Sequence, residues 1–240
     1  MGGRYTAGIP KRRKPNPDQR RLDLCDAALQ LLADEGAKGL SHLKVDGRAG
    51  VPDGTTSFYF RTRSALLHAV AARMVELDLA ALQTVADSAA VEAGSAASTL
   101  AKVVIQSGLD PQLSRTRARY ELTIQAARDP AIAATLQRAT DAFTALHHDT
   151  LAQLVPHGAD LDPAVVDDLR NVTLTFINGL MLRFVHGDRI IDTAEQLDGV
   201  LSAIVAGVLH SENRGRLTHD GGTRTEARRL STVAFSTAIE

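Results

Sequence analysis

The sequence contains a single cysteine, Cys25, among its 240 residues, so no disulfide bond can form within one chain. We expect its thiol to be half-buried in the first helix and to take no part in redox sensing. A secretory signal is also lacking, because no apolar stretch follows the basic amino-terminal segment. The longest apolar stretch, 172–185, is interrupted by Asn178 and Arg183 and is shorter than the roughly 20 residues of a membrane helix. These absences predict a soluble cytoplasmic protein without a membrane partner.

Motifs of known catalytic sites are lacking as well. No glutamate is followed by a histidine three residues later, as the di-iron sites of helical bundles require. No phosphate-binding glycine loop, nucleophile elbow or metal-spaced cysteine and histidine set occurs. The adjacent His147 and His148 would point about 100° apart on a helix and form no ready chelate. We therefore expect no enzyme, no metal site and no cofactor, and the low aromatic content of 4% leaves the chemistry of any ligand open.

The charges are balanced overall, with a formal net charge of −1, but they are unevenly distributed. Residues 1–75 contain 13 lysines and arginines against 7 acidic residues, whereas the remaining residues contain 14 against 21. A basic head on an acidic body is typical of a nucleic-acid-binding end joined to a part with another function. Four positive charges lie in the segment 11–15. They belong either to a solvated tail or to an arm that lies along or in a DNA minor groove.

Apolar residues recur at helical spacing along most of the chain, and no segment alternates with period two long enough to predict a sheet. The sequence therefore predicts an all-α fold of about nine helices, with prolines and glycines at their ends. We expect a flexible basic arm at 1–17, a helix-turn-helix DNA-binding domain at 18–64, a ligand-binding and dimerisation domain at 65–211, and a disordered tail at 212–240. The predicted helices cover about 18–35, 42–49, 52–60, 63–85, 97–108, 113–128, 131–155, 163–186 and 194–211.

The stretch from Leu40 to Arg63 predicts two short helices that meet at a sharp turn, as in a helix-turn-helix motif. Ser41 is a suitable N-cap, Gly50 permits the turn, and Pro52 suits the first position of the second helix. Short polar side chains on that second helix can reach base edges in a major groove. We predict DNA contacts from Ser41, His42, Lys44, Thr55, Thr56, Ser57, Tyr59, Arg61 and Arg63.

Two observations leave room for another interpretation of this stretch. Asp53 would repel phosphates, although a carboxylate there also complements a helix N-terminus. The two short helices could instead merely complete a bundle, with either Phe58 or Phe60 in its core. The turn, the cap and the local positive charge together favour the DNA-binding interpretation.

Three segments carry a family resemblance: LCDAALQLLADEGAKGLSHL, RAGVPDGTTSFYF and RTRSALLHAV. Residues 18–85 resemble the tetracycline-repressor (TetR) family of bacterial transcriptional regulators, in versions common among actinobacteria, and beyond them only the pattern and lengths of helices agree. The resemblance implies that the second helix of the motif lies in the major groove and that Arg63 contacts a phosphate. It also implies a homodimer formed by the last two long helices, and a pocket for a small molecule among the middle helices.

Wide apolar stripes on the last two predicted helices fit such a dimer, although they could equally fill the core of a monomer. The predicted interface consists of Phe176, Leu180, Phe184, Leu197, Leu201, Ile204 and Val208. A two-fold dimer would read an inverted-repeat operator in double-stranded DNA.

For the effector pocket that the resemblance implies, we predict a lining of larger or polar residues on inward helix faces, each of which could also be a core filler or a surface charge. These residues are Tyr120, Glu121, Ile124, Phe143, His147, Phe176 and Arg183. The sequence thus favours a repressor that an effector releases from DNA through the helix that begins at Arg63. The alternative is an architectural DNA-binding protein without ligand control.

Overall fold

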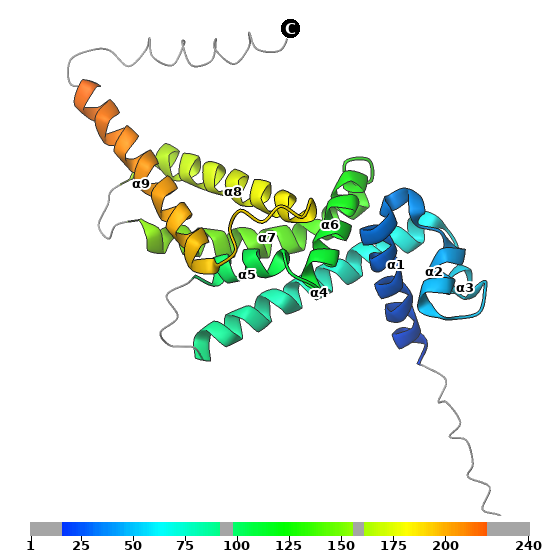
Figure 1. The fold of residues 1–240 in the computed structure, drawn as a ribbon. Helices are drawn as coiled ribbons and strands as arrows, with labels where there is room; N and C mark the ends of the chain where they lie inside the picture. The colour runs from blue at the N-terminus through cyan, green and yellow to red at the C-terminus, as the bar shows by residue number, and fades with distance from the viewer. Residues whose placement is uncertain (1–15, 92–97, 156–160, 220–240) are drawn as a thin grey trace, which may run out of the picture. The chain divides into compact units, whose positions relative to one another are not determined.

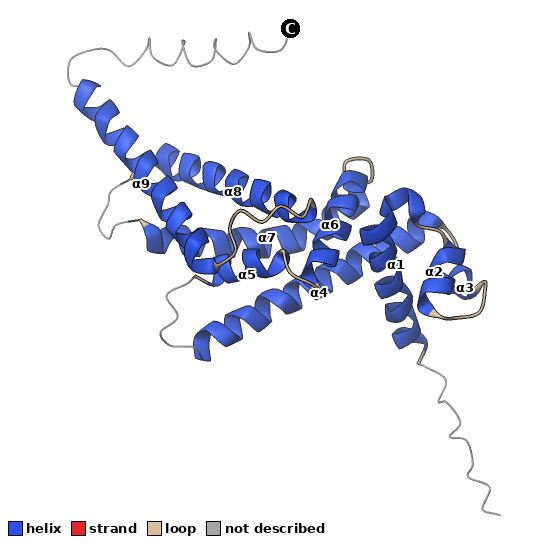
Figure 2. Ribbon diagram, in the orientation of Figure 1, coloured by secondary structure: helices blue, strands red, loops and turns tan. Residues whose placement is uncertain are grey.

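The computed structural model of the chain describes residues 16–91, 98–155 and 161–219, with side chains omitted at 88–91 and 212–219 (Figure 1). The described residues form nine helices and no strand, which confirms the all-α prediction (Figure 2). Most helix ends lie within three residues of their predicted positions. The helices are α1 (Pro17–Gly39), α2 (His42–Ala49), α3 (Thr55–Tyr59), α4 (Arg63–Val91), α5 (Thr99–Ser107), α6 (Gln112–Ala126), α7 (Pro130–Leu154), α8 (Pro163–Val185) and α9 (Ala194–His219).

Helix ends follow the local chemistry of the sequence. Pro17, Pro130 and Pro163 each open a helix, where their missing N–H costs no hydrogen bond. The preceding Asp162 side chain accepts from Ala164 N at 2.9 Å, which caps α8. At Gly36 the backbone turns to φ 69° and interrupts α1, close to the predicted stop, before a last helical turn that ends at Gly39. The predicted ends at Val85 and Ser211 were too early, because α4 and α9 continue to Val91 and His219. Of the predicted arm 1–17 and the predicted tail 212–240, residues 1–15 and 220–240 lie outside the described residues, whereas 212–219 belong to α9.

The chain divides into two compact units, and the divisions fall within α4, between α5 and α6, and within α7. Unit 1 contains residues 1–81 and 110–141, and unit 2 contains residues 82–109 and 142–240. Unit 1 therefore holds more than the predicted segment 18–64, because α6 packs against α1 and contributes Ala118 and Leu122 to the same core. The remaining core of unit 1 comes mainly from α1 and α4.

Cys25 lies in that core and is fully buried rather than half-buried. Burial raises the pKa of its thiol to about 12, so the thiol stays protonated and unreactive at neutral pH.

Unit 2 is built from α5, α8 and α9 together with the adjoining parts of α4 and α7. Asp198 of α9 accepts hydrogen bonds from the backbone N and the hydroxyl of Ser98, both at 2.6 Å, and so holds the start of α5. A Cβ on Gly108 would lie 2.7 Å from the Phe184 ring, so the ring requires glycine there. Within the described ranges, no helix is both long enough and apolar enough to cross a membrane.

Candidate functional site

The turn between α2 and α3 follows the predicted chemistry. Ser41 has an extended backbone, and its hydroxyl accepts from Lys44 N at 3.3 Å, which confirms it as the N-cap of α2. Gly50 lies in the left-handed region at φ 64°, where a side chain would be strained. Its N–H donates to the carbonyl groups of the last turn of α2. Ser41 and Gly50 thus define the two ends of α2, and Gly50 sets the direction in which the chain leaves this helix.

A buried carboxylate, which the sequence analysis missed, holds α3 against α2. Asp46 is only 1% exposed, and its side chain accepts from Gly54 N at 2.8 Å and from Thr56 N at 2.7 Å. The Thr56 hydroxyl donates to the same carboxylate at 2.5 Å. A carboxylate that accepts from the first N–H groups of a helix is favourable, because it satisfies donors that have no intrahelical partner. Asp46 therefore fixes the start of α3.

This geometry corrects two predictions. Thr56 is 0% exposed and its hydroxyl is bound to Asp46, so our prediction of a DNA contact from Thr56 was wrong. Pro52 does not open the helix, since Gly54 at φ 87° occupies the N-cap position and α3 begins at Thr55. The Thr55 hydroxyl donates to the Pro52 carbonyl at 2.6 Å within the turn.

The other end of α3 is held from α1 and α2. His42 Nε2 donates to the Phe60 carbonyl at 2.7 Å, so this nitrogen of the half-buried imidazole is directed at the protein. Arg21 donates to the Tyr59 carbonyl at 3.3 Å, and its guanidinium lies 4.7 Å from the centre of the Phe60 ring. The sequence analysis missed Arg21, because only the fold brings it to α3.

The basic residues of the motif differ in how they are held. Arg63 donates to the carbonyl groups of Ala37 and Leu40, at the junction of α1 and α2, and has further N–H groups. Lys44 forms an ion pair with Glu35 of α1. Exposed pairs of this kind contribute little free energy. Arg61 lies exposed directly after α3.

The outer face of α3 carries Ser57 and Phe58, both exposed. Phe60, not Phe58, is the core residue of the pair that we considered. Phe58 is 76% exposed, and its ring meets the Tyr59 ring edge to face with the ring centres 5.2 Å apart. Tyr59 itself is half-buried. Of the predicted DNA contacts on α3, Ser57 is thus the most accessible.

The seven predicted effector residues are divided between the two units. In unit 1, Glu121 Oε2 accepts from Ala37 N at 2.9 Å and so binds the end of α1. Ile124 is 56% exposed and therefore does not line an internal pocket as predicted. Tyr120 is half-buried, and burial raises the pKa of its phenol. In unit 2, Arg183 is exposed and forms an ion pair with Asp188, which corrects its predicted role as well.

His147 is the most deeply buried of the predicted effector residues; Phe143 and Phe176 are half-buried. The Nε2 atom of His147 lies 2.7 Å from the Thr173 hydroxyl, and this hydroxyl donates its one proton to the Leu169 carbonyl at 2.6 Å. The Nε2 atom must therefore carry the proton of the neutral ring. Burial lowers the pKa of His147 to about 4, so the ring is neutral at physiological pH.

The predicted dimer interface requires a correction. Leu180, Phe184, Leu197 and Leu201 are all buried within unit 2, so they cannot form a contact with a second chain. Phe176, Ile204 and Val208 are half-buried. The apolar or small residues that α8 and α9 do expose lie on their opposite faces: Val172, Gly179 and Leu182 on α8, and Gly199, Ala203, Ala206 and Gly207 on α9.

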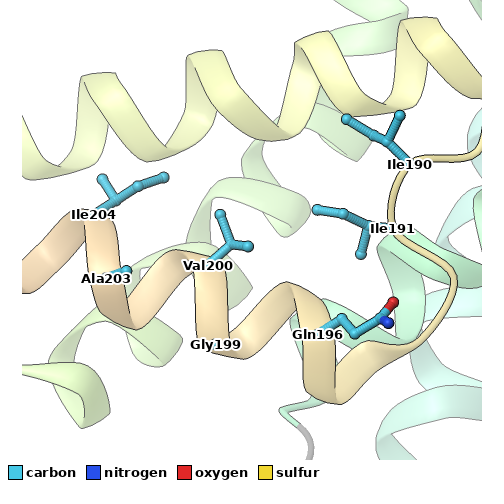
Figure 3. A pocket seen from close by; sticks show the side chains of 7 residues that line it. All are labelled: Ile190, Ile191, Gln196, Gly199, Val200, Ala203 and Ile204. Carbon is cyan, nitrogen blue, oxygen red and sulfur yellow. The ribbon is translucent and has the colours of Figure 1, made fainter.

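A shallow, largely apolar groove of about 620 Å³ lies beside the amino-terminal half of α9 (Figure 3). Two of its residues come from the loop between α8 and α9 and the others from α9. It includes none of the predicted effector residues and, from the predicted interface, only Ile204. Its lining consists of Ile190, Ile191, Gln196, Gly199, Val200, Ala203 and Ile204. Across the three described ranges, no group of histidine, cysteine, aspartate or glutamate side chains could hold a metal ion.

Comparison with known proteins adds independent information. The family model described as "Tetracyclin repressor-like, C-terminal domain" matches residues 91–211. No curated protein matches the chain.

Several solved structures have a similar fold. A TetR-family member from Streptomyces coelicolor A3 is 25% identical with a TM-score of 0.54, and the match covers 78% of this chain and 98% of the other. A transcriptional regulator from Rhodococcus sp. Rha1 is 18% identical, with a TM-score of 0.58 and coverages of 80% and 96%. The multidrug binding protein EbrR, complexed with ethidium, is 25% identical, with a TM-score of 0.51 and coverages of 79% and 99%.

Proposed function

Because this chain belongs to the tetracycline-repressor-like (TetR) family of transcriptional regulators, we propose that it is a repressor released from DNA by a small molecule. It binds an inverted-repeat operator on the bacterial nucleoid as a homodimer. The three parts of this proposal, which are DNA reading, dimerisation and effector release, are supported by different observations.

The observation that carries DNA reading is the rigid presentation of α3. Asp46 holds its first turn, while Arg21 and His42 hold its last carbonyl groups, so that the buried Thr56 and Phe60 are on the inner side. The exposed side chains of α3 are thereby oriented before DNA is bound, which reduces the entropy lost on binding. Ser57 and Tyr59 are the proposed contacts to bases. Ser41, Lys44, Arg61 and Arg63 are the proposed contacts to phosphates.

A single five-residue helix makes too few contacts to specify one site, and a second copy of the chain supplies the other half. We place the dimer contact on the exposed faces of α8 and α9 in place of the buried stripes. Gly179 of α8 and Gly199 and Ala203 of α9 allow close approach of helices, while Val172 and Leu182 supply exposed apolar surface. The two recognition helices then meet half-sites that are separated by about 34 Å or a multiple of it.

Effector binding is proposed for unit 2, which contains most of the segment matched by the family model. EbrR, a protein of similar fold, is described as a multidrug binding protein in complex with ethidium. Binding can release DNA only if the effector favours the conformation that binds DNA poorly.

Helix α4 is the route that we propose for this coupling, because it belongs to both units and begins at Arg63. The Arg63 guanidinium binds the carbonyl groups of Ala37 and Leu40, and Glu121 binds Ala37 N. A displacement of α4 or α6 would therefore act on the junction that carries α2.

Selection from random DNA duplexes by the purified full chain tests this function. Recovery of one inverted repeat, with half-sites about one helical turn apart, supports a sequence-specific dimeric regulator. Recovery of all sequences alike would instead support an architectural DNA-binding protein. The asymmetric case, in which a single half-site is recovered, would contradict the dimer.

A further inference from the structure

The most exposed large apolar side chain among the described residues lies on the helix that we propose to read DNA. Phe58 is 76% exposed, ahead of Leu43 on α2 at 62%. Its direction is fixed, because the residues two before and two after it in the sequence, Thr56 and Phe60, are buried. The edge-to-face contact with the Tyr59 ring restricts the phenyl group further. Phe58 is therefore an apolar ring of fixed direction on the proposed recognition helix, available for contact with an apolar group of a binding partner.

The surroundings of Phe58 favour DNA over a protein as that partner. Along the sequence, the nearest exposed side chains on either side of Phe58 are the hydroxyl of Ser57 and the guanidinium of Arg61, so the exposed residues that flank this ring are polar and basic. A protein interface would require a contiguous apolar core of much larger area. The edge of a major groove has the matching composition, since it presents hydrogen-bonding atoms, phosphates and one apolar group, the C5 methyl of thymine.

We propose that Phe58 packs against the C5 methyl group of a thymine at one position of each operator half-site and is thereby a specificity-determining residue. This inference rests on the proposed DNA-binding function. The contact selects thymine over cytosine at that position, because cytosine offers no methyl group there. Burial of one methyl group corresponds to about a fourfold gain in affinity, and two symmetric half-sites give roughly fifteenfold.

Deoxyuridine substitution tests the contact at the level of one methyl group. The operator recovered by selection from random duplexes is synthesised with each symmetric pair of thymines replaced in turn by deoxyuridine, which lacks only the C5 methyl. Dissociation constants are then measured at fixed salt for the full-length wild type, for F58A and for L43A. L43A is the matched control, since it removes the second most exposed apolar side chain, which lies on α2 rather than α3.

We expect one thymine pair at which the substitution weakens wild-type and L43A binding about fifteenfold and leaves F58A binding unchanged. Wild-type binding that is indifferent to every substitution, or an equal loss for F58A, would overturn the proposal. Because Phe58 is exposed, F58A should retain the thermal unfolding curve of the wild type. If no preferred sequence is recovered at all, it is the proposed function that fails, and this outcome is separate from a failure of the methyl contact.

Discussion

Replacing Asp46 should loosen the recognition helix more than any other single substitution in the motif. The side chain of Asp46 accepts three hydrogen bonds, from Gly54 N, from Thr56 N and from the Thr56 hydroxyl. Hydrogen bonds to a charged group contribute about 1.5–3 kcal/mol each. The donors that D46A leaves behind lie next to the exposed Asp53 and Ser57, so water replaces part of the loss. We therefore expect D46A to lower the free energy of unfolding by about 2–4 kcal/mol.

Two milder variants separate the contributions of these bonds. D46N keeps an acceptor for Thr56 but turns an amide donor towards Gly54 N–H, so we expect a loss of about 1–2 kcal/mol. T56V removes the hydroxyl bond alone and should cost about 1 kcal/mol. D53N is the control, since Asp53 is an exposed carboxylate of the same turn, and it should leave stability unchanged.

Urea unfolding of the full chain, followed by circular dichroism, measures these differences. Amide hydrogen exchange at Gly54 and Thr56 locates them, because both amides should lose protection in D46A while the amides of α8 do not. The reasoning is refuted if D46A unfolds at the same urea concentration as D53N, or if Gly54 and Thr56 stay as protected as in the wild type.

Three further predictions concern unit 2. In analytical ultracentrifugation, L182E should convert the dimer to a folded monomer, whereas I124E, at an exposed apolar residue of unit 1, should leave the mass of the particle unchanged. If both variants have the same mass, α8 is not part of the dimer interface. G108A should lower the free energy of unfolding by about 1–3 kcal/mol, because its Cβ meets the Phe184 ring. G47A is the control, since a Cβ there meets nothing, and it should be neutral or stabilising; a G108A variant as stable as the wild type would show that the ring can move. Burial lowers the pKa of His147 from its usual 6.5 to about 4, so between these pH values the unfolded chain binds a proton that the folded chain does not. The free energy of unfolding therefore falls as the pH drops through this window, by at most about 1.4 kcal/mol per pH unit. The H147L variant should lose this part of the pH dependence, and an unchanged slope would contradict the burial argument.

Much of the fold could be predicted from local signals. Proline at the first helical position, glycine at helix ends and apolar spacing are properties of a few neighbouring residues, and they located all nine described helices, although the start of α3 and the ends of α4 and α9 were wrong. The Ser41 cap and the Gly50 turn were predictable for the same reason, since their partners lie within three or four residues.

The inward and outward sides of α3 could not be predicted in this way. A helix of five residues has little more than one turn, so periodicity does not define its faces, and Phe58 and Phe60 looked equivalent. Thr56 was misassigned because its partner, Asp46, belongs to another helix. A buried carboxylate that accepts hydrogen bonds across a turn leaves no periodic trace in the sequence.

Four of the seven interface residues were misassigned for a different reason. The apolar stripes of α8 and α9 are wide enough to include both the core and an exposed face, so composition does not tell Leu180 or Leu197 from Leu182. The long-range bond between Glu121 and Ala37 likewise has no local signal, although it gives Glu121 a role at the end of α1.

The central claim is that two copies of this chain each present α3 to one face of a DNA duplex. Hydroxyl-radical footprinting of the selected operator, combined with the stoichiometry of the complex, measures this directly. The account predicts two chains per duplex and two symmetric protected segments, about one helical turn or a multiple of it apart. One chain per duplex, or protection that spreads without regard to sequence, would contradict it.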